Sequence, residues 1–192
     1  MLAGLIDAAG ELPDWREGRP ERDDHYGALV RAIVGQQLSV LAARAIYGRL
    51  LERFGGRPPT PQEVLDDDPE QLRSVGLSHA KVKYLRSLAE HVLSGELELD
   101  RLGKLSDEQV MSELTAVKGI GEWSAEIFLM FHLGRPDVVA AGDLGIRRAI
   151  ERAYGLPELP DVAQVRAIAE PWRPYRTLAC RYLWHSLHNA PA

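Results

Sequence analysis

Apolar residues recur at helical spacing along almost the whole chain, and this pattern constrains the fold more than any other feature of the sequence. Between residues 38 and 54, for example, Leu41, Ala45, Ile46 and Leu50 form one apolar stripe. Runs of five or more residues that alternate in the manner of a β-strand are hard to find. The pattern therefore predicts an all-α protein.

Local signals mark where these helices begin and end. A helix that starts near Tyr26 is expected to break at Gly35-Gln36-Gln37, and Gly55-Gly56 is expected to end the next one. Residues that favour the N-cap position mark six further starts, at Thr60, Asp68, Ser78, Ser106, Asp143 and Asp161. The last helix is expected to begin near Pro174. The sequence thus predicts about ten helices joined mostly by short loops.

The composition is typical of a globular protein that folds in water. With 192 residues, 45% of them hydrophobic and 27% charged, the chain can bury one large core or two smaller ones. Cys180 is the only cysteine, which excludes an internal disulfide and a four-cysteine zinc or iron–sulfur site. The sequence shows neither a basic leader nor an apolar run of membrane-spanning length. We therefore expect a cytoplasmic protein.

The charge is unevenly distributed. A net charge of -5 argues against a strongly basic nucleic-acid-binding protein. However, seven acidic residues lie within residues 1–30 and five within 57–70, whereas residues 165–192 carry four arginines against one acid. Two interpretations of this last segment stay open, namely a basic face for a polyanion or an ordinary solvated surface.

The most informative segment is Leu114-Thr-Ala-Val-Lys-Gly-Ile-Gly-Glu-Trp-Ser-Ala125, in which one predicted helix leads directly into another. Gly119 and Gly121 permit a tight turn around Ile120, whose side chain would pack into the core. Backbone amides at the start of the second helix would then bind a phosphate diester without needing a basic surface. The alternative is an ordinary αα-hairpin with a glycine turn.

This segment resembles the helix-hairpin-helix motif of DNA-binding and DNA-repair proteins, and three other segments extend the resemblance. Asp143 follows Gly121 by 22 residues, at a position similar to the catalytic aspartate of the helix-hairpin-helix DNA glycosylase superfamily. Ala32-Ile-Val-Gly-Gln-Gln-Leu-Ser39 resembles the turn that these enzymes press into DNA. Trp172-Arg-Pro-Tyr-Arg176 and the following Leu183-Trp184 resemble the end of the 3-methyladenine DNA glycosylase II (AlkA-type) group.

The resemblance implies an all-α, two-lobed helix-hairpin-helix DNA glycosylase fold with the active-site cleft between the lobes. Residues 26–135 would form one lobe, with the hairpin at about 107–134, and residues 1–25 would join 136–192 in the other. The 25 residues before the first matching helix leave no room for the N-terminal β-rich domain of larger AlkA proteins. We therefore expect the short form of the enzyme.

The resemblance also implies a monofunctional DNA N-glycosylase that flips an alkylated purine, such as 3-methyladenine, out of double-stranded DNA and leaves an abasic site. Members with β-lyase activity carry a lysine two positions after the second hairpin glycine, where this chain has Trp123. No lyase activity is therefore expected. Two alternatives are a glycosylase for a deaminated, oxidised or mismatched base and a non-enzymatic helix-hairpin-helix module that only binds DNA.

Individual site residues carry over from the same motifs. Asp143 would stabilise the developing oxocarbenium ion or orient the attacking water, unless it only caps its helix. Four side chains would line the base pocket: Trp123, Trp184, Ile127 and Leu144. The two tryptophans would hold a cationic purine by stacking, or would instead belong to the core.

DNA contacts are expected around the hairpin and the upstream turn. Four residues would bind the DNA backbone: Lys118, Gly119, Gly121 and Ser124. Gln37 or Leu38 would fill the gap left by the flipped base as a wedge, and the alternative is a buried glutamine pair that satisfies helix ends. The backbone carbonyls of Thr115, Val117 and Ile120 would bind a structural Na⁺ or K⁺.

No other cofactor is expected to be required for catalysis. The six histidines show no zinc-like grouping, because His185 and His188 lie one turn apart without a third ligand nearby. Iron–sulfur clusters are excluded by the cysteine count. A single flipped base needs a single pocket, so we expect a monomer.

Overall fold

The computed structural model describes residues 2–13 and 24–188, and all regular secondary structure in those ranges is helical. This confirms the all-α prediction. The chain divides into two compact units, one of Pro20–Phe128 and one of Met1–Arg19 with Leu129–Ala192. The lobe boundary expected near residue 25 directly follows residues 14–23, which lie outside the described part of the chain.

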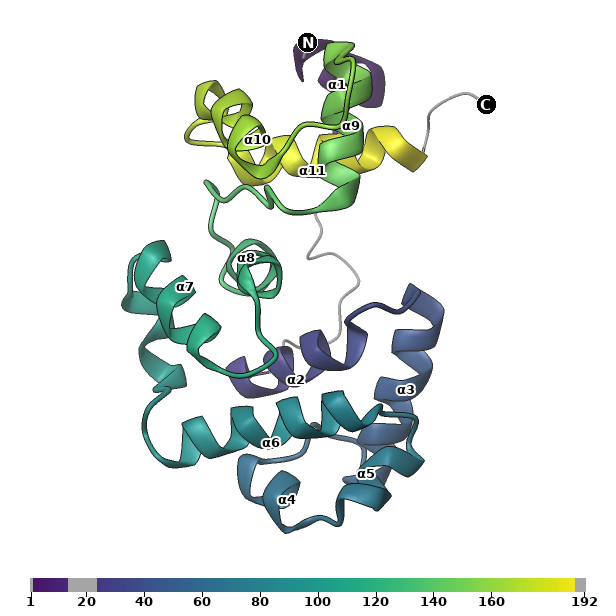
Figure 1. The fold of residues 1–192 in the computed structure, drawn as a ribbon, viewed down its shortest axis with the longest axis vertical. Helices are drawn as coiled ribbons and strands as arrows, with labels where there is room; N and C mark the ends of the chain where they lie inside the picture. Colours follow the sequence, from purple (N-terminus) through teal and green to yellow (C-terminus); the bar gives the residue numbers. More distant parts are fainter. Residues whose placement is uncertain (1, 14–23, 189–192) are drawn as a thin grey trace. The chain divides into compact units, whose positions relative to one another are not determined.

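The unit Pro20–Phe128 is built around α6 (His79–Leu93), which contacts α2, α4 and α5 (Figure 1). Its core holds Leu29, Ile33, Leu85 and Leu88, each with at most 1% of its surface exposed. Their burial supplies the main stabilisation of this unit. The other helices that begin in this unit are α2 (His25–Gly35), α3 (Val40–Arg53), α4 (Pro61–Asp66), α5 (Pro69–Ser74), the 3₁₀ helix Leu99–Lys104, α7 (Asp107–Ala116) and α8 (Glu122–Phe131).

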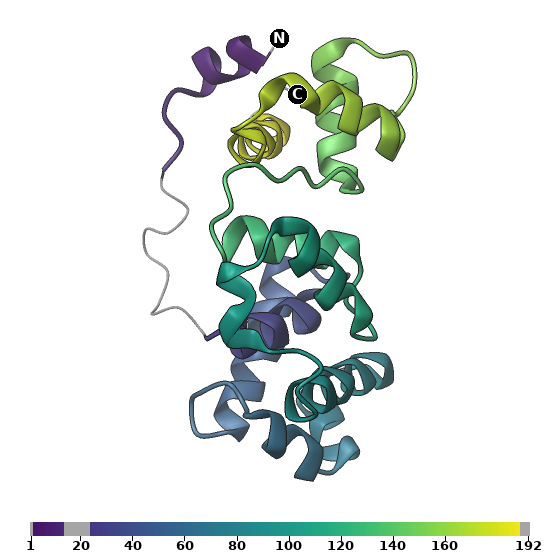
Figure 2. The same cartoon turned by 90° about the vertical axis from the view of Figure 1, so that its left-hand side faces the viewer.

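The second unit is held together by α11 (Arg176–His188), which packs against α9 (Leu144–Tyr154) and α1 (Leu2–Ala9). Figure 2 looks nearly along the axis of α11, in yellow. The remaining helices of this unit are α10 (Val162–Ala169) and the 3₁₀ turn Glu170–Trp172. The last helix begins at Arg176, two residues after Pro174, where its start was expected, and it follows a cis bond between Arg173 and Pro174.

Side-chain caps begin most of these helices as the sequence predicts. Thr60, Ser106 and Asp161 each form a complete capping box, in which the side chain three residues later returns a bond to the backbone of the cap. Asp68 also caps its helix, but its carboxylate accepts from the N–H of Glu70 and no box forms. Local polar residues therefore fix where helices begin in both units.

The turn between α2 and α3 differs from the prediction. Gln36 caps α2, and its N–H donates to Ile33 O at 3.3 Å, but α3 begins at Val40 instead of Leu38. Gln37 has a φ of 55°, which is uncommon for a residue other than glycine. This left-handed residue turns the chain, and the N-cap moves to Ser39, whose hydroxyl accepts from Ala42 N.

The connection from α8 to α9 is anchored to the start of α11. The Thr177 hydroxyl donates to Arg135 O at 2.7 Å and accepts from Val138 N at 3.1 Å. The Arg176 guanidinium binds both the carbonyl and the carboxylate of Asp137, with Nε 2.7 Å from Oδ1. These bonds hold the non-helical segment that leads to Asp143 in one conformation.

Asp137 is also the basis of a pH-dependent prediction. Burial raises the pKa of this carboxyl, but hydrogen bonds and charge attraction from Arg176 and Arg173 outweigh burial, so that its pKa lies below the ordinary value. The resulting stabilisation is present above the unfolded-state pKa and is lost as the pH falls through the folded-state pKa. We expect Asp137→Asn to lower the free energy of unfolding by about 1–3 kcal/mol at neutral pH.

Urea unfolding of the wild type and Asp137→Asn checks this expectation. The difference between the two proteins should narrow once the pH falls below about 4. The exposed Asp100→Asn serves as the control and should match the wild type throughout. A difference that persists unchanged in acid would show that Asp137 acts through packing rather than charge.

Candidate active site and nucleic-acid interface

Asp143 lies at the N-terminus of α9, and its carboxylate makes two hydrogen bonds through one oxygen. Oδ1 accepts from Ile146 N at 2.9 Å, which confirms the predicted helix cap. The same oxygen accepts from the indole Nε1 of Trp184 on α11 at 2.8 Å. Two donors from two helices therefore fix the orientation of the carboxylate.

The space around this pair of residues is tight. A Cβ atom on Gly145 would lie 2.9 Å from Asp143 Oδ1 and 3.2 Å from Trp184 Cδ1. On another side, the rings of Phe131 and Trp184 are 5.9 Å apart between centroids, at an interplanar angle of 37°. Glycine is therefore the residue that lets the indole approach the carboxylate.

The hydrogen bond from Trp184 is a feature that the sequence did not reveal. The resemblance assigned Trp184 to the base pocket, whereas the structure gives its indole N–H a positioning contact with Asp143. A tryptophan 41 residues from an aspartate carries no local signal of such contact. Only the packing of α11 against α9 brings the two side chains together.

For the base release that the resemblance implies, Trp184→Phe is expected to lower the rate roughly tenfold and to leave the fold intact, because it removes a hydrogen bond to a charged group and keeps an aromatic ring. Single-turnover kinetics and a thermal unfolding curve measure the two effects separately. Trp172→Phe, at a buried tryptophan of the 3₁₀ turn, is the matched control. Equal rates for Trp184→Phe and the wild type would show that the indole N–H does not position the carboxylate.

The other proposed pocket residues lie on α8 and at the start of α9. Trp123 is 43% exposed and Leu144 is 48% exposed, so both present apolar surface at the molecular boundary. Ile127 is half-buried and lies four residues after Trp123, on the same helix face. Trp123 and Ile127 belong to one unit and Leu144 and Trp184 to the other, so their common pocket stays a prediction.

The hairpin between α7 and α8 is built as the sequence indicates. Ile120 is 4% exposed, which confirms that its side chain packs into the core. Gly119 has a φ of 94°, and a Cβ atom there would lie 2.1 Å from Cγ of Tyr84. Gly121 is exposed, and a Cβ atom there would meet nothing within 4 Å. The two glycines thus serve different purposes, one fitting against a ring and one leaving the surface open.

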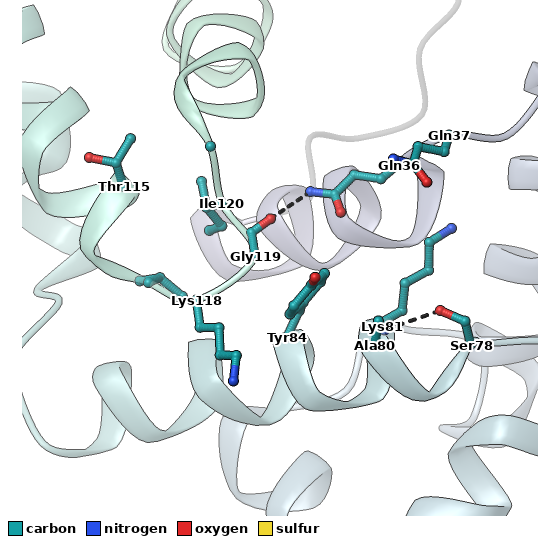
Figure 3. A pocket seen from close by; sticks show the side chains of 12 residues that line it. Gln36, Gln37, Ser78, Ala80, Lys81, Tyr84, Thr115, Lys118, Gly119 and Ile120 are labelled. Carbon is teal, nitrogen blue, oxygen red and sulfur yellow. Dashed lines mark hydrogen bonds between the residues drawn. The ribbon is translucent and has the colours of Figure 1, made fainter.

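A cavity of about 440 Å³ opens beside this hairpin, between it, the turn after α2 and the start of α6 (Figure 3). Lys118 lies at the tip of the hairpin and is exposed. Ser124 is instead 7% exposed, and its hydroxyl accepts from Gln36 Nε2 at 3.2 Å. Contact of all four predicted hairpin residues with DNA stays a prediction, and two of the four also bind within the protein: the Ser124 hydroxyl and the Gly119 carbonyl, which accepts from Gln36 Nε2 at 2.8 Å.

The three carbonyls expected to bind a monovalent cation come from the same hairpin. Thr115 and Val117 line the cavity together with Ile120. The Val117 carbonyl accepts from Ile120 N at 3.0 Å, and a carbonyl oxygen retains a second lone pair for a cation. Within residues 2–13 and 24–188 no group of three or more His, Cys, Asp or Glu is placed to hold a metal ion.

The predicted wedge residues are on the surface. Gln37 and Leu38 are both exposed, and Leu38 has 38% of its surface exposed. The alternative of a buried glutamine pair is wrong for Gln37, since it is exposed, and applies only to the half-buried Gln36.

The C-terminal arginines do not form a free basic face. Arg173 pairs with Glu170 and Asp137, and Arg176 pairs with Asp137. Arg181 donates to the carbonyl of Pro13.

In the described ranges no helix is long and apolar enough to span a bilayer.

Comparisons with known proteins agree with this geometry. Residues 30–174 match the model of the HhH-GPD superfamily base excision DNA repair proteins. DNA-3-methyladenine glycosylase 1 of Schizosaccharomyces pombe is 39% identical over 166 residues, which cover 85% of this chain and 73% of that protein. The structure of S. pombe 3-methyladenine DNA glycosylase (Mag1) in complex with abasic DNA superposes with a TM-score of 0.88 at 36% identity, covering 98% of this chain and 91% of that one. The DNA-3-methyladenine glycosidase of Bacillus halodurans gives a TM-score of 0.83 at 40% identity, covering 98% and 84%.

Proposed function

Because the chain belongs to the HhH-GPD superfamily of base excision DNA repair proteins, we propose that it is a monofunctional DNA glycosylase for alkylated purines of the 3-methyladenine type. The observation that carries this proposal is the carboxylate of Asp143, fixed at the start of α9 by the indole of Trp184. The names of the relatives from S. pombe and B. halodurans support the choice of lesion.

The chemistry requires a negative charge close to the sugar. As the bond between C1′ and the purine nitrogen breaks, its electron pair neutralises the cationic base, and positive charge develops on the deoxyribose. Asp143 would stabilise that charge or orient the water whose oxygen bonds to C1′ and whose proton is released. An aspartate at a helix N-terminus is well placed for either role, because the helix dipole favours negative charge there.

Base flipping and the end product follow from the neighbouring residues. Exposed Trp123 and Leu144, with Ile127 and Trp184, would receive the extruded purine by stacking and apolar contact. Trp123 has no amine to attack C1′, so no Schiff base would form and the abasic strand would stay intact. We further propose that catalysis needs no metal cofactor and that a Na⁺ or K⁺ at the hairpin is structural. The protein would act as a monomer in the cytoplasm. In a bacterium it would be associated with the nucleoid.

Release of free base from methylated duplex DNA under single-turnover conditions tests the proposal. The protein should release 3-methyladenine, and the strands should break only after hot alkali reveals the abasic sites. Strand breakage without alkali would contradict the monofunctional assignment. Release of only deaminated or oxidised bases would change the lesion, and binding without any release would leave a DNA-binding module.

A further inference from the structure

Gln36 joins two parts of the protein that are expected to meet DNA separately. Its side-chain Nε2 donates to the carbonyl of Gly119 at 2.8 Å and to the hydroxyl of Ser124 at 3.2 Å. Figure 3 shows this amide reaching from the end of α2 to the hairpin. The residues joined are 83 and 88 positions apart in the sequence, so this contact fixes tertiary geometry rather than a local turn.

The residue after Gln36 is the candidate wedge. Gln37 is exposed and has the left-handed φ of 55°, so its direction depends directly on how Gln36 is held. Leu38 follows, and its N–H donates to Gly35 O at 3.3 Å, which closes the turn. Gln37 and Leu38 can enter a stack of DNA bases only if the turn that carries them is rigid.

Further contacts hold the same turn and the same hairpin. The Lys81 ammonium on α6 donates to the carbonyl of Val34, in the last turn of α2, at 2.7 Å. Tyr84, one turn further along α6, packs its ring where a side chain on Gly119 would lie. All these residues belong to the unit Pro20–Phe128. The end of α2, the hairpin and the start of α6 therefore form one cross-linked assembly around the cavity.

The buried position of Ser124 supports the same interpretation. The residue is 7% exposed and its hydroxyl accepts from the Gln36 amide, so the side chain serves the link between hairpin and turn. Gly119 contributes only a carbonyl to this link. Neither contact consumes the exposed surface of Gly121 or Lys118, which remains available to the DNA backbone.

We propose that Gln36 is a positioning residue that sets the wedge relative to the hairpin, so that placing the hairpin on a phosphate backbone places Gln37 in the base stack. The inference rests on the proposed function, because it assigns a part in extruding the base. Gln36 itself touches neither the base nor the sugar in this scheme. Its loss should impair extrusion and leave both backbone binding and bond cleavage intact.

The test compares paired and unpaired lesions with Gln36→Met, which has nearly the shape of glutamine but no donor. One duplex carries 7-methylguanine opposite cytosine, and the other carries it opposite an abasic-site analogue, where extrusion costs less. We expect the single-turnover rate to fall about tenfold on the paired duplex and less than threefold on the unpaired one. Affinity for abasic-analogue DNA should stay within about threefold of the wild-type value. Gln62→Met, at a glutamine on α4 bonded only to nearby Asp66 in the helix, is the control and should behave as wild type on both duplexes.

A double-mutant cycle tests whether Gln36 acts through Gln37. Once Gln37→Ala has removed the wedge, adding Gln36→Met should cost little more, so the two effects should be less than additive. Equal losses on paired and unpaired duplexes, or fully additive effects, would overturn the proposal in favour of a general structural role.

A direct measure of extrusion separates this inference from the proposed function. Fluorescence of 2-aminopurine beside the lesion rises when the neighbouring stack opens, whether or not a base is released. If the wild type releases neither 7-methylguanine from these duplexes nor 3-methyladenine from methylated DNA, the proposed function fails, and the fluorescence alone decides the inference. A signal that Gln36→Met loses and Gln62→Met retains supports it, and a signal unchanged in Gln36→Met overturns it.

Discussion

Asp143→Asn is expected to slow single-turnover base release from methylated DNA by about a hundredfold or more, which corresponds to about 2.7 kcal/mol of barrier. Asparagine is as good a helix cap as aspartate. Its side-chain oxygen can still accept from Ile146 N and Trp184 Nε1, as Asp143 Oδ1 does. The substitution thus removes the charge and little else, and the unfolding midpoint and DNA affinity should stay close to the wild-type values.

Asp161→Asn is the matched control for this experiment. Asp161 caps α10 with the same geometry, accepting from Gln164 N at 2.8 Å, but it has no part in the proposed chemistry. We expect wild-type base release from Asp161→Asn. If Asp143→Asn also releases base at close to the wild-type rate, then Asp143 is only a helix cap and the catalytic group lies elsewhere.

The largest effect on folding is expected from Gly119→Ala. The new Cβ would lie 2.1 Å from Cγ of Tyr84. The alanine would also have to adopt the left-handed φ of 94° that the glycine has here. Steric overpacking and backbone strain together should cost about 2–5 kcal/mol of unfolding free energy. Urea unfolding measures this cost, and binding to abasic-analogue DNA should weaken at the same time because the hairpin must shift.

Two further variants test whether Gly119→Ala loses stability and DNA affinity because its Cβ collides with Tyr84. Gly121→Ala meets nothing within 4 Å and should fold like the wild type, so any loss of DNA affinity there reports on the surface alone. Tyr84→Ala opens the space beside Gly119 and should recover part of the stability that Gly119→Ala loses. A Gly119→Ala protein as stable as the wild type would show that the hairpin accommodates a side chain.

The parts of the fold that the sequence predicts best are those with local causes. The capping boxes at Thr60, Ser106 and Asp161 form because a polar side chain and its partner lie three residues apart. By contrast, α1 was not predicted. None of its residues is buried, and it is held by contact with α11 at the other end of the chain. Such a helix depends on its partner rather than on its own pattern.

In the candidate site too, the sequence predicts the features that have local causes and misses those that depend on distant contacts. The cap formed by Asp143 and the buried Ile120 follow from short motifs, and both are confirmed. The indole bond from Trp184 and the amide bonds from Gln36 join distant segments, so no window of sequence contains both partners. The shift of α3 to Val40 had no signal either, because a left-handed glutamine is not favoured by its residue type.

The internal use of the arginines has a consequence for how the protein would search a genome. Guanidinium groups of Arg173, Arg176 and Arg181 bind carboxylates and carbonyls of their own unit, so these three cations are less available to displace counterions from a duplex. Each phosphate neutralised by a protein cation adds about 0.9 to the steepness of the plot of log affinity against log salt concentration. A shallow salt dependence would mean short residence on undamaged DNA and a search made of many brief encounters rather than long slides.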